Sequence, residues 1–255
     1  MKRIFRRPAT VRPASLGVVV LLALTSASVA AADAGPGPLG VTGDPGASSH
    51  GARVGALFGA DRAGRLPGGH FCTASVVHSP RGDLVVTAAH CVDGAGDLVF
   101  VPGYRDGRAP YGVWRVTRTF LPDGWKRARD EDSDLAFATV TGPGGRRLED
   151  VVGAGRFATG VATGATAVTV TGYPDSRETP VTCTNRPTAR SGTQQRIACP
   201  DFTGGTSGSP WVDGDGRVVG VLGGHEQGGA TADVSYSVVL GGEAARLYRE
   251  AAAGS

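Results

Sequence analysis

Three polar residues stand where an apolar run meets a turn, and together they could carry out acyl transfer. His90 follows an apolar run in "VVTAAHCV", Asp134 directly precedes "LAFATV", and Ser207 lies in "DFTGGTSGSPWV". A serine hydroxyl is a poor nucleophile without an adjacent base, and an imidazole oriented by a carboxylate is such a base. The sequence thus offers a nucleophile, a general base and a group that orients the base.

Glycines surround the candidate nucleophile. Gly205 and Gly208 flank the pair Thr206–Ser207 and permit a strained turn. The backbone N–H groups of Gly205 and Ser207 could converge there as an oxyanion hole. Simpler explanations exist for each motif: a tight turn at 201–208, a solvated loop histidine, and a solvated acidic turn at 130–134.

Short β-branched or aromatic runs, separated by Gly, Pro and Asp turns, must position these residues. About six such runs lie between residues 54 and 140, and a second set lies at about 156–240, after a connector at 141–156. This pattern predicts an all-β chain of two antiparallel β-barrels with a cleft between them. Ala244, Leu247, Tyr248 and Ala251 recur at helical spacing, which predicts a C-terminal helix at about 242–252.

The first 52 residues differ from the rest of the chain. Residues 1–32 have a basic start, a short apolar core and small residues, which are the three regions of a secretory signal peptide. Residues 33–52 are rich in Gly, Pro and Ser, and we expect a flexible leader or pro-segment there. The protein is therefore expected to be secreted, extracellular and free of the membrane once the signal is removed.

Charge gives no support for nucleic-acid binding. The whole chain carries 26 basic and 23 acidic residues. Five of the basic residues and none of the acidic ones lie in residues 1–32, so the remainder has 21 basic against 23 acidic residues, a net charge of −2. The positive charge belongs to the signal, and we expect no nucleic-acid partner.

Four cysteines, Cys72, Cys91, Cys183 and Cys199, favour two disulfides in an exported chain. Three pairings are possible, and one of them keeps each bridge within one half of the chain. The spacing lacks the CxxC pairs of a zinc site. The cluster Asp213–Gly216 predicts a hairpin turn, and it lacks the ligand ladder of a calcium loop. We expect no metal and no cofactor.

The blocks "FCTASVV…LVVTAAHC", "DSDLAFATV" and "GGTSGSPWV" resemble, in this order, the signatures of chymotrypsin/trypsin-like serine proteases. The likeness is greatest to the secreted bacterial branch that includes glutamyl endopeptidases, and it covers about residues 54–250. It implies one protease domain at 53–255 with a Greek-key barrel in each half. It also implies His90 as general base, Asp134 as its orienter, Ser207 as nucleophile, Gly205 and Ser207 as oxyanion hole, and the disulfides Cys72–Cys91 and Cys183–Cys199.

The chain departs from animal trypsins next to the nucleophile. Those enzymes have an Asp there, which pairs with a new N-terminus freed by proteolysis, whereas this chain has Thr206. A cut between Arg53 and Val54 would therefore lack its acidic partner. We expect Val54–Phe58 to be simply the first strand.

Two hypotheses on substrate preference remain open. Asp201 lies six residues before Ser207, at the place where trypsin carries the acidic residue at the bottom of its primary pocket. An Asp there would favour substrates with Arg or Lys. His225 follows Gly223 and Gly224 in a segment that resembles the strand alongside bound substrate, and it would favour acidic side chains. A turn residue and a loop histidine are the simpler explanations.

These features predict a secreted serine endopeptidase that is a monomer and acts on peptide or protein substrates through an acyl-enzyme. The alternative is a non-catalytic homologue that keeps the fold as a binding protein. An esterase of the α/β-hydrolase type does not fit, because its nucleophile precedes its acid and histidine in the chain.

Overall fold

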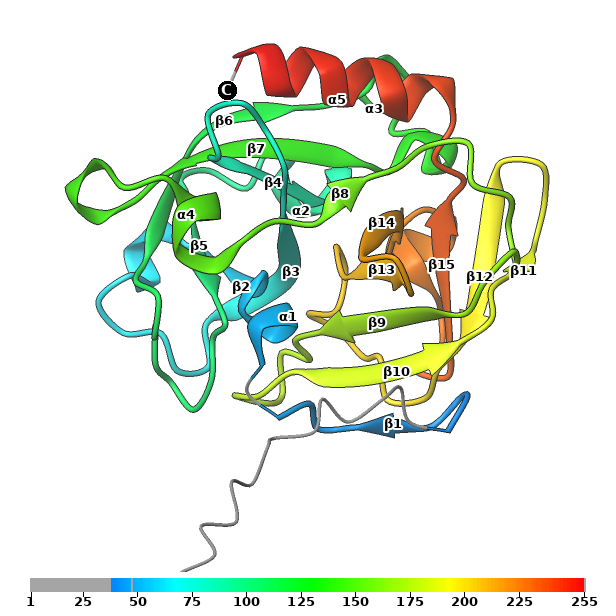
Figure 1. The fold of residues 1–255 in the computed structure, drawn as a ribbon, viewed down its shortest axis with the longest axis horizontal. Helices are drawn as coiled ribbons and strands as arrows, with labels where there is room; N and C mark the ends of the chain where they lie inside the picture. The colour runs from blue at the N-terminus through cyan, green and yellow to red at the C-terminus, as the bar shows by residue number, and fades with distance from the viewer. Residues whose placement is uncertain (1–37, 47, 255) are drawn as a thin grey trace, which may run out of the picture. The chain divides into compact units, whose positions relative to one another are not determined.

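A computed structural model describes residues 38–46 and 48–254, and β-strands dominate it (Figure 1). The predicted signal segment, residues 1–32, lies outside the described residues. No helix within the described residues is both long and apolar enough to cross a membrane.

The strands follow the runs that the sequence predicts. The strands of the first half are β2 (Val54–Gly59), β3 (His70–Val77), β4 (Leu84–Thr87), β5 (Leu98–Pro102), β6 (Trp114–Phe120) and β7 (Ala136–Thr141). Those that follow are β8 (Arg156–Phe157), β9 (Val168–Gly172), β10 (Val181–Asn185), β11 (Thr188–Ala189), β12 (Gln194–Ala198), β13 (Pro210–Asp213), β14 (Arg217–Val221) and β15 (Val234–Val238).

Helical segments are short, apart from the last. The α-helices are α1 (Ser49–Ala52), α2 (Ala89–Val92), α3 (Asp123–Ala128), α4 (Leu148–Val152) and α5 (Gly242–Gly254), and the 3₁₀ turns are η1 (Ala60–Arg62), η2 (Glu131–Ser133), η3 (Pro143–Gly145) and η4 (His225–Gly228).

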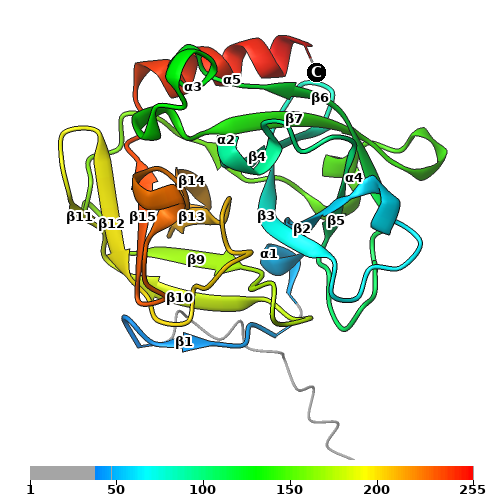
Figure 2. The same cartoon turned by 180° about the vertical axis from the view of Figure 1, so that it is seen from behind.

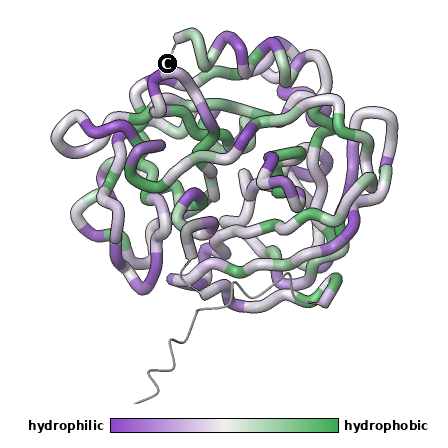
Figure 3. Tube along the Cα trace, in the orientation of Figure 1, coloured by the Kyte–Doolittle hydropathy of each residue, from purple (hydrophilic) through white to green (hydrophobic). Residues whose placement is uncertain are grey.

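The first half is a closed barrel with the order β2-β3-β4-β7-β6-β5. Three consecutive strands, β2 to β4, lie side by side, and β5 returns to pair with β2, which is the order of a Greek key. Apolar residues follow the strands, whereas polar residues gather in the outer loops (Figure 3). Leu57, Val85, Phe100 and Trp114 are among the buried side chains that fill the interior.

The second half is barrel-like. It consists of a sheet with the order β1-β10-β9-β13-β14-β8, in which β1 is Thr42–Gly43, and a second sheet with the order β11-β12-β15. A single bridge, Leu222 to Ser237, joins the two sheets, and β8 pairs with β14 in parallel. Val170, Ile197 and Trp211 pack between the sheets. The hairpin predicted at 213–216 joins β13 to β14.

Residues 38–46 form an arm on the second half, whereas the sequence predicts a flexible leader at 33–52. The strand β1 (Thr42–Gly43) pairs antiparallel with the outer edge of β10 (Figure 1). The Thr42 hydroxyl also donates to Pro200 O at 2.5 Å. The composition of this segment does not reveal the arm, because the arm is held by backbone pairing with a strand edge and by small polar side chains.

The arm then passes to the first half. Asp44 forms an ion pair with Arg177 of the second half, and Arg105 of the first half donates to Pro45 O at 2.6 Å. The chain next forms α1 and enters β2 at Val54. Val54–Phe58 does form a strand, as the sequence predicts, but it is the first strand of the barrel and not of the chain, because β1 precedes it.

The loop 173–180 of the second half packs against the first barrel. Glu178 accepts hydrogen bonds from Gly68 N, at 2.8 Å, and from the hydroxyl of Tyr104. Burial, followed by the hydrogen bond to Glu178, raises the pKa of Tyr104, so this hydroxyl stays protonated and donates. His70 lies in the same contact, with Nε2 2.8 Å from Pro174 O.

Helix α5 lies over the first barrel beside β6 and β7 (Figure 2). Its buried residues Ala244, Leu247 and Ala251 pack in the cluster that contains Leu84 and Phe137. The predicted helix is confirmed, with its end at Gly254.

Candidate active site

His90 lies in the one-turn helix α2, directly after the buried strand β4. The next residue, Cys91, forms a disulfide with Cys72 on β3, and Cys183 pairs with Cys199 in the second half. Both predicted disulfides are therefore present. The Cys72–Cys91 bridge ties the start of β3 to the backbone next to the histidine, which holds the imidazole on a rigid support.

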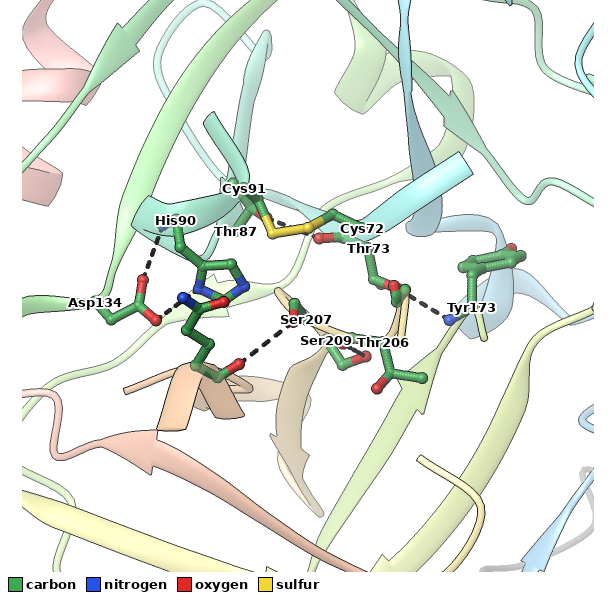
Figure 4. Close-up of a disulfide and its surroundings, with 12 residues drawn as sticks. Cys72, Thr73, Thr87, His90, Cys91, Asp134, Tyr173, Thr206, Ser207 and Ser209 are labelled. Atoms are coloured by element: carbon green, nitrogen blue, oxygen red, sulfur yellow. Dashed lines mark hydrogen bonds and ion pairs between the residues drawn. A yellow bond between two sulfur atoms is a disulfide. The ribbon is translucent and has the colours of Figure 1, made fainter. Parts of the chain in front are cut away.

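Asp134 is fully buried at the entrance to β7 and orients His90. Its Oδ2 accepts from His90 Nδ1 at 2.7 Å and from Gly224 N at 2.8 Å, while its Oδ1 accepts from His90 N at 3.0 Å (Figure 4). A buried carboxylate with three N–H donors is well satisfied. With its Nδ1–H donated to Asp134, the neutral ring presents a free lone pair on Nε2.

Ser207 lies in the loop before β13, and each backbone carbonyl of residues 204 to 207 accepts a hydrogen bond. Gly204 O accepts from Asp175 N at 2.8 Å, and Thr206 O accepts from Ser209 Oγ at 2.6 Å and from Ser209 N at 3.1 Å. In a trans peptide the N–H points away from the preceding carbonyl. The N–H groups of Gly205 and Ser207 therefore point away from these partners, and they donate to no residue in the described part of the chain.

Thr206, which stands where animal trypsins have Asp, is satisfied within its own loop. Its hydroxyl donates to Thr203 O at 2.7 Å, and its side chain is buried. The loop is thus ordered without an acidic residue beside the nucleophile.

Gly208 is expected to tolerate no side chain. Its φ is +86°, and an added Cβ would lie 2.0 Å from Thr73 O and 2.2 Å from Thr87 Oγ1. Gly208→Ala therefore has to displace the loop that carries Ser207, and a shift of about 1 Å lowers turnover by roughly 100-fold. The loss of turnover is measured from initial rates of casein digestion by Gly208→Ala and by the unchanged protein. Gly214→Ala is the matched control, because a Cβ there meets nothing within 4 Å; equal rates in the two variants would contradict the prediction.

The turn η4 contacts the candidate nucleophile. The Ser207 hydroxyl donates to Gln227 O at 3.4 Å, and no hydrogen bond between Ser207 and His90 occurs among the described residues. Asp134, the His90 ring and Ser207 nevertheless follow one another in Figure 4, which places the ring on the side of Asp134 that faces the serine.

Glu131 holds this turn in place. It accepts from Glu226 N at 3.0 Å through Oε1, and its Oε2 lies 3.4 Å from His225 Nδ1. Glu226 and Gln227 have left-handed φ values of 51° and 55°. Such a conformation costs about 1–2 kcal/mol for each non-glycine residue. The contact between Gln227 and Ser207 is therefore part of a strained turn.

A pocket beside His90 is lined by charged side chains and one tryptophan. Asp93, Trp125, Arg129 and Glu131 surround it. Asp93 Oδ2 accepts from Trp125 Nε1 at 3.1 Å and from Arg129 Nε at 3.0 Å, which fixes this wall.

Of the predicted substrate-binding residues, Gly224 lines the pocket beside His90, between its neighbours Gly223 and His225. Gly224 donates to Asp134, and Gly223 N donates to Tyr236 O at 3.0 Å. The His225 ring contacts Tyr236 edge to face, with ring centroids 4.9 Å apart. Asp201 lies apart from the pocket beside His90, on an exposed turn with φ +66°.

The sequence analysis did not identify Thr73 or Gln227 as site residues. It also did not predict that Glu131 holds the turn η4. Glu131 is visible only as one member of an acidic run, and its partners lie more than 90 residues away. The pair Gly228–Gly229 after Gln227 was the one available signal of an unusual backbone.

A closed Greek-key barrel and a barrel-like second half, with an oriented histidine and a glycine-flanked serine where they meet, define the trypsin-like class of fold. The chain belongs to the trypsin-like peptidase family, because the family profile described as a trypsin-like peptidase domain matches residues 72–221. The resemblance that the three motif blocks predict is thus confirmed.

Relatives include proteases of bacteria. A glutamyl endopeptidase of Bacillus licheniformis is 31% identical over 136 residues, which are 49% of this chain and 41% of that protein. The match therefore spans less than half of that relative's length. The protease Anisep of Arthrobacter nicotinovorans is 28% identical with a TM-score of 0.70, over 83% of this chain and 99% of that one. The thermostable serine protease AL20 of an extremophilic microorganism is 26% identical with a TM-score of 0.70, over 82% and 100%.

Proposed function

We propose that this protein is a secreted serine endopeptidase in which His90, Asp134 and Ser207 form the catalytic triad. The observation that carries the proposal is the fully buried Asp134 carboxylate, which accepts both the backbone N–H and the ring N–H of His90. The His90 imidazole that this carboxylate orients borders an open pocket, where a substrate could reach it.

In the proposed reaction, His90 Nε2 takes the proton of Ser207 Oγ as the oxygen attacks the peptide carbonyl. The N–H groups of Gly205 and Ser207 receive the negative charge that develops on the carbonyl oxygen. His90 then protonates the leaving amine, and water hydrolyses the acyl-enzyme by the reverse proton path. For Ser207 to donate to His90, its hydroxyl must leave Gln227 O, which rotation of the serine side chain can achieve.

Covalent labelling tests the proposed nucleophile directly. A fluorophosphonate is expected to add one phosphonyl group to the folded, disulfide-bonded protein, with peptide mapping locating it on Ser207. His90→Ala is expected to abolish labelling, because the hydroxyl then lacks its base. Labelling at another residue, or equal labelling of the variant, would contradict the assignment.

One observation favours a second function, a non-catalytic binding protein of the same fold. The Ser207 hydroxyl is engaged by Gln227 O in the absence of substrate. A protein whose turn stays in this position would bind peptides without cleaving them. It would show no labelling and no digestion of casein, although it would be fully folded.

We further propose a preference for cleavage after Glu or Asp. The similarity to a glutamyl endopeptidase supports this preference. The His225 ring would bind the acidic side chain, and its present neighbours, Glu131 Oε2 at 3.4 Å and Glu226 Oε2 at 3.6 Å, would have to move aside because like charges repel. A mixed peptide library is expected to be cut after acidic residues, and His225→Gln is expected to lower these rates about tenfold, as the loss of one charge-assisted contact predicts. Cleavage after Arg or Lys that is lost in Asp201→Asn would instead assign the preference to Asp201.

Secretion, the removal of an N-terminal segment and a monomeric state belong to the same proposal. Two disulfides fit an oxidising compartment. Residues 38–46 pair with β10, so cleavage before Val54 would not by itself release this arm.

A further inference from the structure

Thr73 is a fully buried polar residue of β3, next to Cys72. Its N–H donates to Ser207 O at 2.7 Å. Its hydroxyl donates to Gly205 O at 3.0 Å and accepts from Tyr173 N at 2.9 Å. One side chain of the first barrel therefore joins two separate loops of the second half.

The loop needs such an external tie because of its glycine. A Cβ on Gly205 would lie 2.5 Å from Asp175 N and 2.6 Å from Tyr173 O, so the close approach of the two loops requires glycine. Glycine has no strong backbone preference of its own. The Gly204–Gly205 peptide, which carries the Gly205 N–H, is held by the hydrogen bond from Asp175 N to Gly204 O, and the next peptide is held by the hydrogen bond from the Thr73 hydroxyl to Gly205 O. Together these two hydrogen bonds restrict rotation of the backbone at Gly205.

Thr73 also connects this loop to the histidine. The Thr87 hydroxyl donates to Thr73 O at 2.8 Å, and β4, which ends at Thr87, leads directly into Ala88, Ala89 and His90 (Figure 4). The same residue thus contacts the loop of the nucleophile and the strand that carries the base.

We propose that Thr73 is a positioning residue, whose hydroxyl holds the Gly205–Thr206 peptide and so limits rotation at Gly205, which keeps the Gly205 N–H facing the carbonyl oxygen of the substrate. This inference rests on the proposed function. Thr73 itself touches no substrate, because its side chain is buried behind Gly205. It acts on the rate of acylation through the direction of one N–H group.

Four variants distinguish a positioning role of Thr73 from a purely structural one. Thr73→Val replaces the hydroxyl with a methyl group of similar size, and Thr73→Ser keeps the hydroxyl. Thr184→Val is the matched control, because Thr184 is also buried and its hydroxyl pairs with that of Thr169 at 2.8 Å, on β9 and β10. Thr73→Ala removes the same hydroxyl without adding a methyl contact, and it replaces Thr73→Val in the experiment if that variant does not fold.

The measurement is the pre-steady-state burst of p-nitrophenol from p-nitrophenyl acetate, which gives the acylation rate and the apparent affinity separately. Thr73→Val is expected to acylate at least about tenfold more slowly with unchanged affinity, within the 10²- to 10³-fold limit for complete loss of an oxyanion donor. Thr73→Ser is expected to restore the rate. Thr184→Val is expected to lower the melting temperature and leave the rate unchanged.

The outcomes distinguish this proposal from the proposed function. A burst in the wild type that disappears in Ser207→Ala supports the nucleophile, whatever Thr73 does. If Thr73→Val then acylates at the wild-type rate, or slows only as much as Thr184→Val, Thr73 is structural and the inference is wrong. The absence of any burst in the folded wild type would overturn the proposed function itself.

Discussion

Ser207→Ala is expected to lower casein hydrolysis by about 10⁵- to 10⁶-fold, because the methyl group has no oxygen to attack the carbonyl. The fold should persist. The Ser207 hydroxyl makes one long hydrogen bond, to Gln227 O, whereas its backbone carbonyl remains bonded to Thr73 N. The melting temperature is therefore expected to change by less than about 2 °C.

Ser176→Ala is the control for this prediction, since Ser176 is exposed on the loop 173–180. It is expected to retain wild-type turnover. Substantial activity in Ser207→Ala would assign the nucleophile to another residue and remove the basis of the proposed mechanism.

Asp134→Asn is expected to have the second largest effect, a decrease in turnover of about 10⁴-fold at neutral pH. The carboxylate accepts three N–H donors, two at Oδ2 and one at Oδ1. An amide offers one oxygen and one NH₂ group, so in either orientation the NH₂ opposes a buried N–H. The negative charge that stabilises the imidazolium is lost as well.

The free energy of unfolding of Asp134→Asn reports on the opposed buried donors alone, whereas its turnover also reports on the lost negative charge. The opposed buried donors are expected to cost about 1–3 kcal/mol of unfolding free energy, measured by urea denaturation. Asp132→Asn, two residues away, is the matched control, because its amide oxygen still accepts from Gln194 Nε2. An Asp134→Asn variant with wild-type turnover would show that His90 needs no carboxylate.

The sequence was sufficient to predict the features that depend on neighbouring residues. His90, Asp134 and Ser207 each stand at the end of an apolar run, and strand ends can be located from the 2-residue periodicity and the glycines that follow. The strands and the terminal helix were predictable for the same reason, whereas the pairing of the cysteines followed from the resemblance to the protease family.

The missed features depend on contacts between distant residues. Thr73 looks like an ordinary β-branched strand residue, and its role becomes visible only when Gly205, 132 positions later, packs against it. The turn over Ser207 depends on Glu131, and the arm depends on the edge of β10. The arm was mispredicted because backbone pairing leaves no mark in the composition of residues 33–52.

The arm on β10 has a consequence for the order in which the protein folds during synthesis. Residues 42–43 leave the ribosome early, but their partner strand begins at Val181. At about 5–20 residues per second, that interval lasts roughly ten seconds. The first barrel can form in this time, yet β1 must wait as an unpaired strand, and helix α5 covers that barrel only at the end of translation. The strand β1 and the helix α5 are thus both docked after the second half exists.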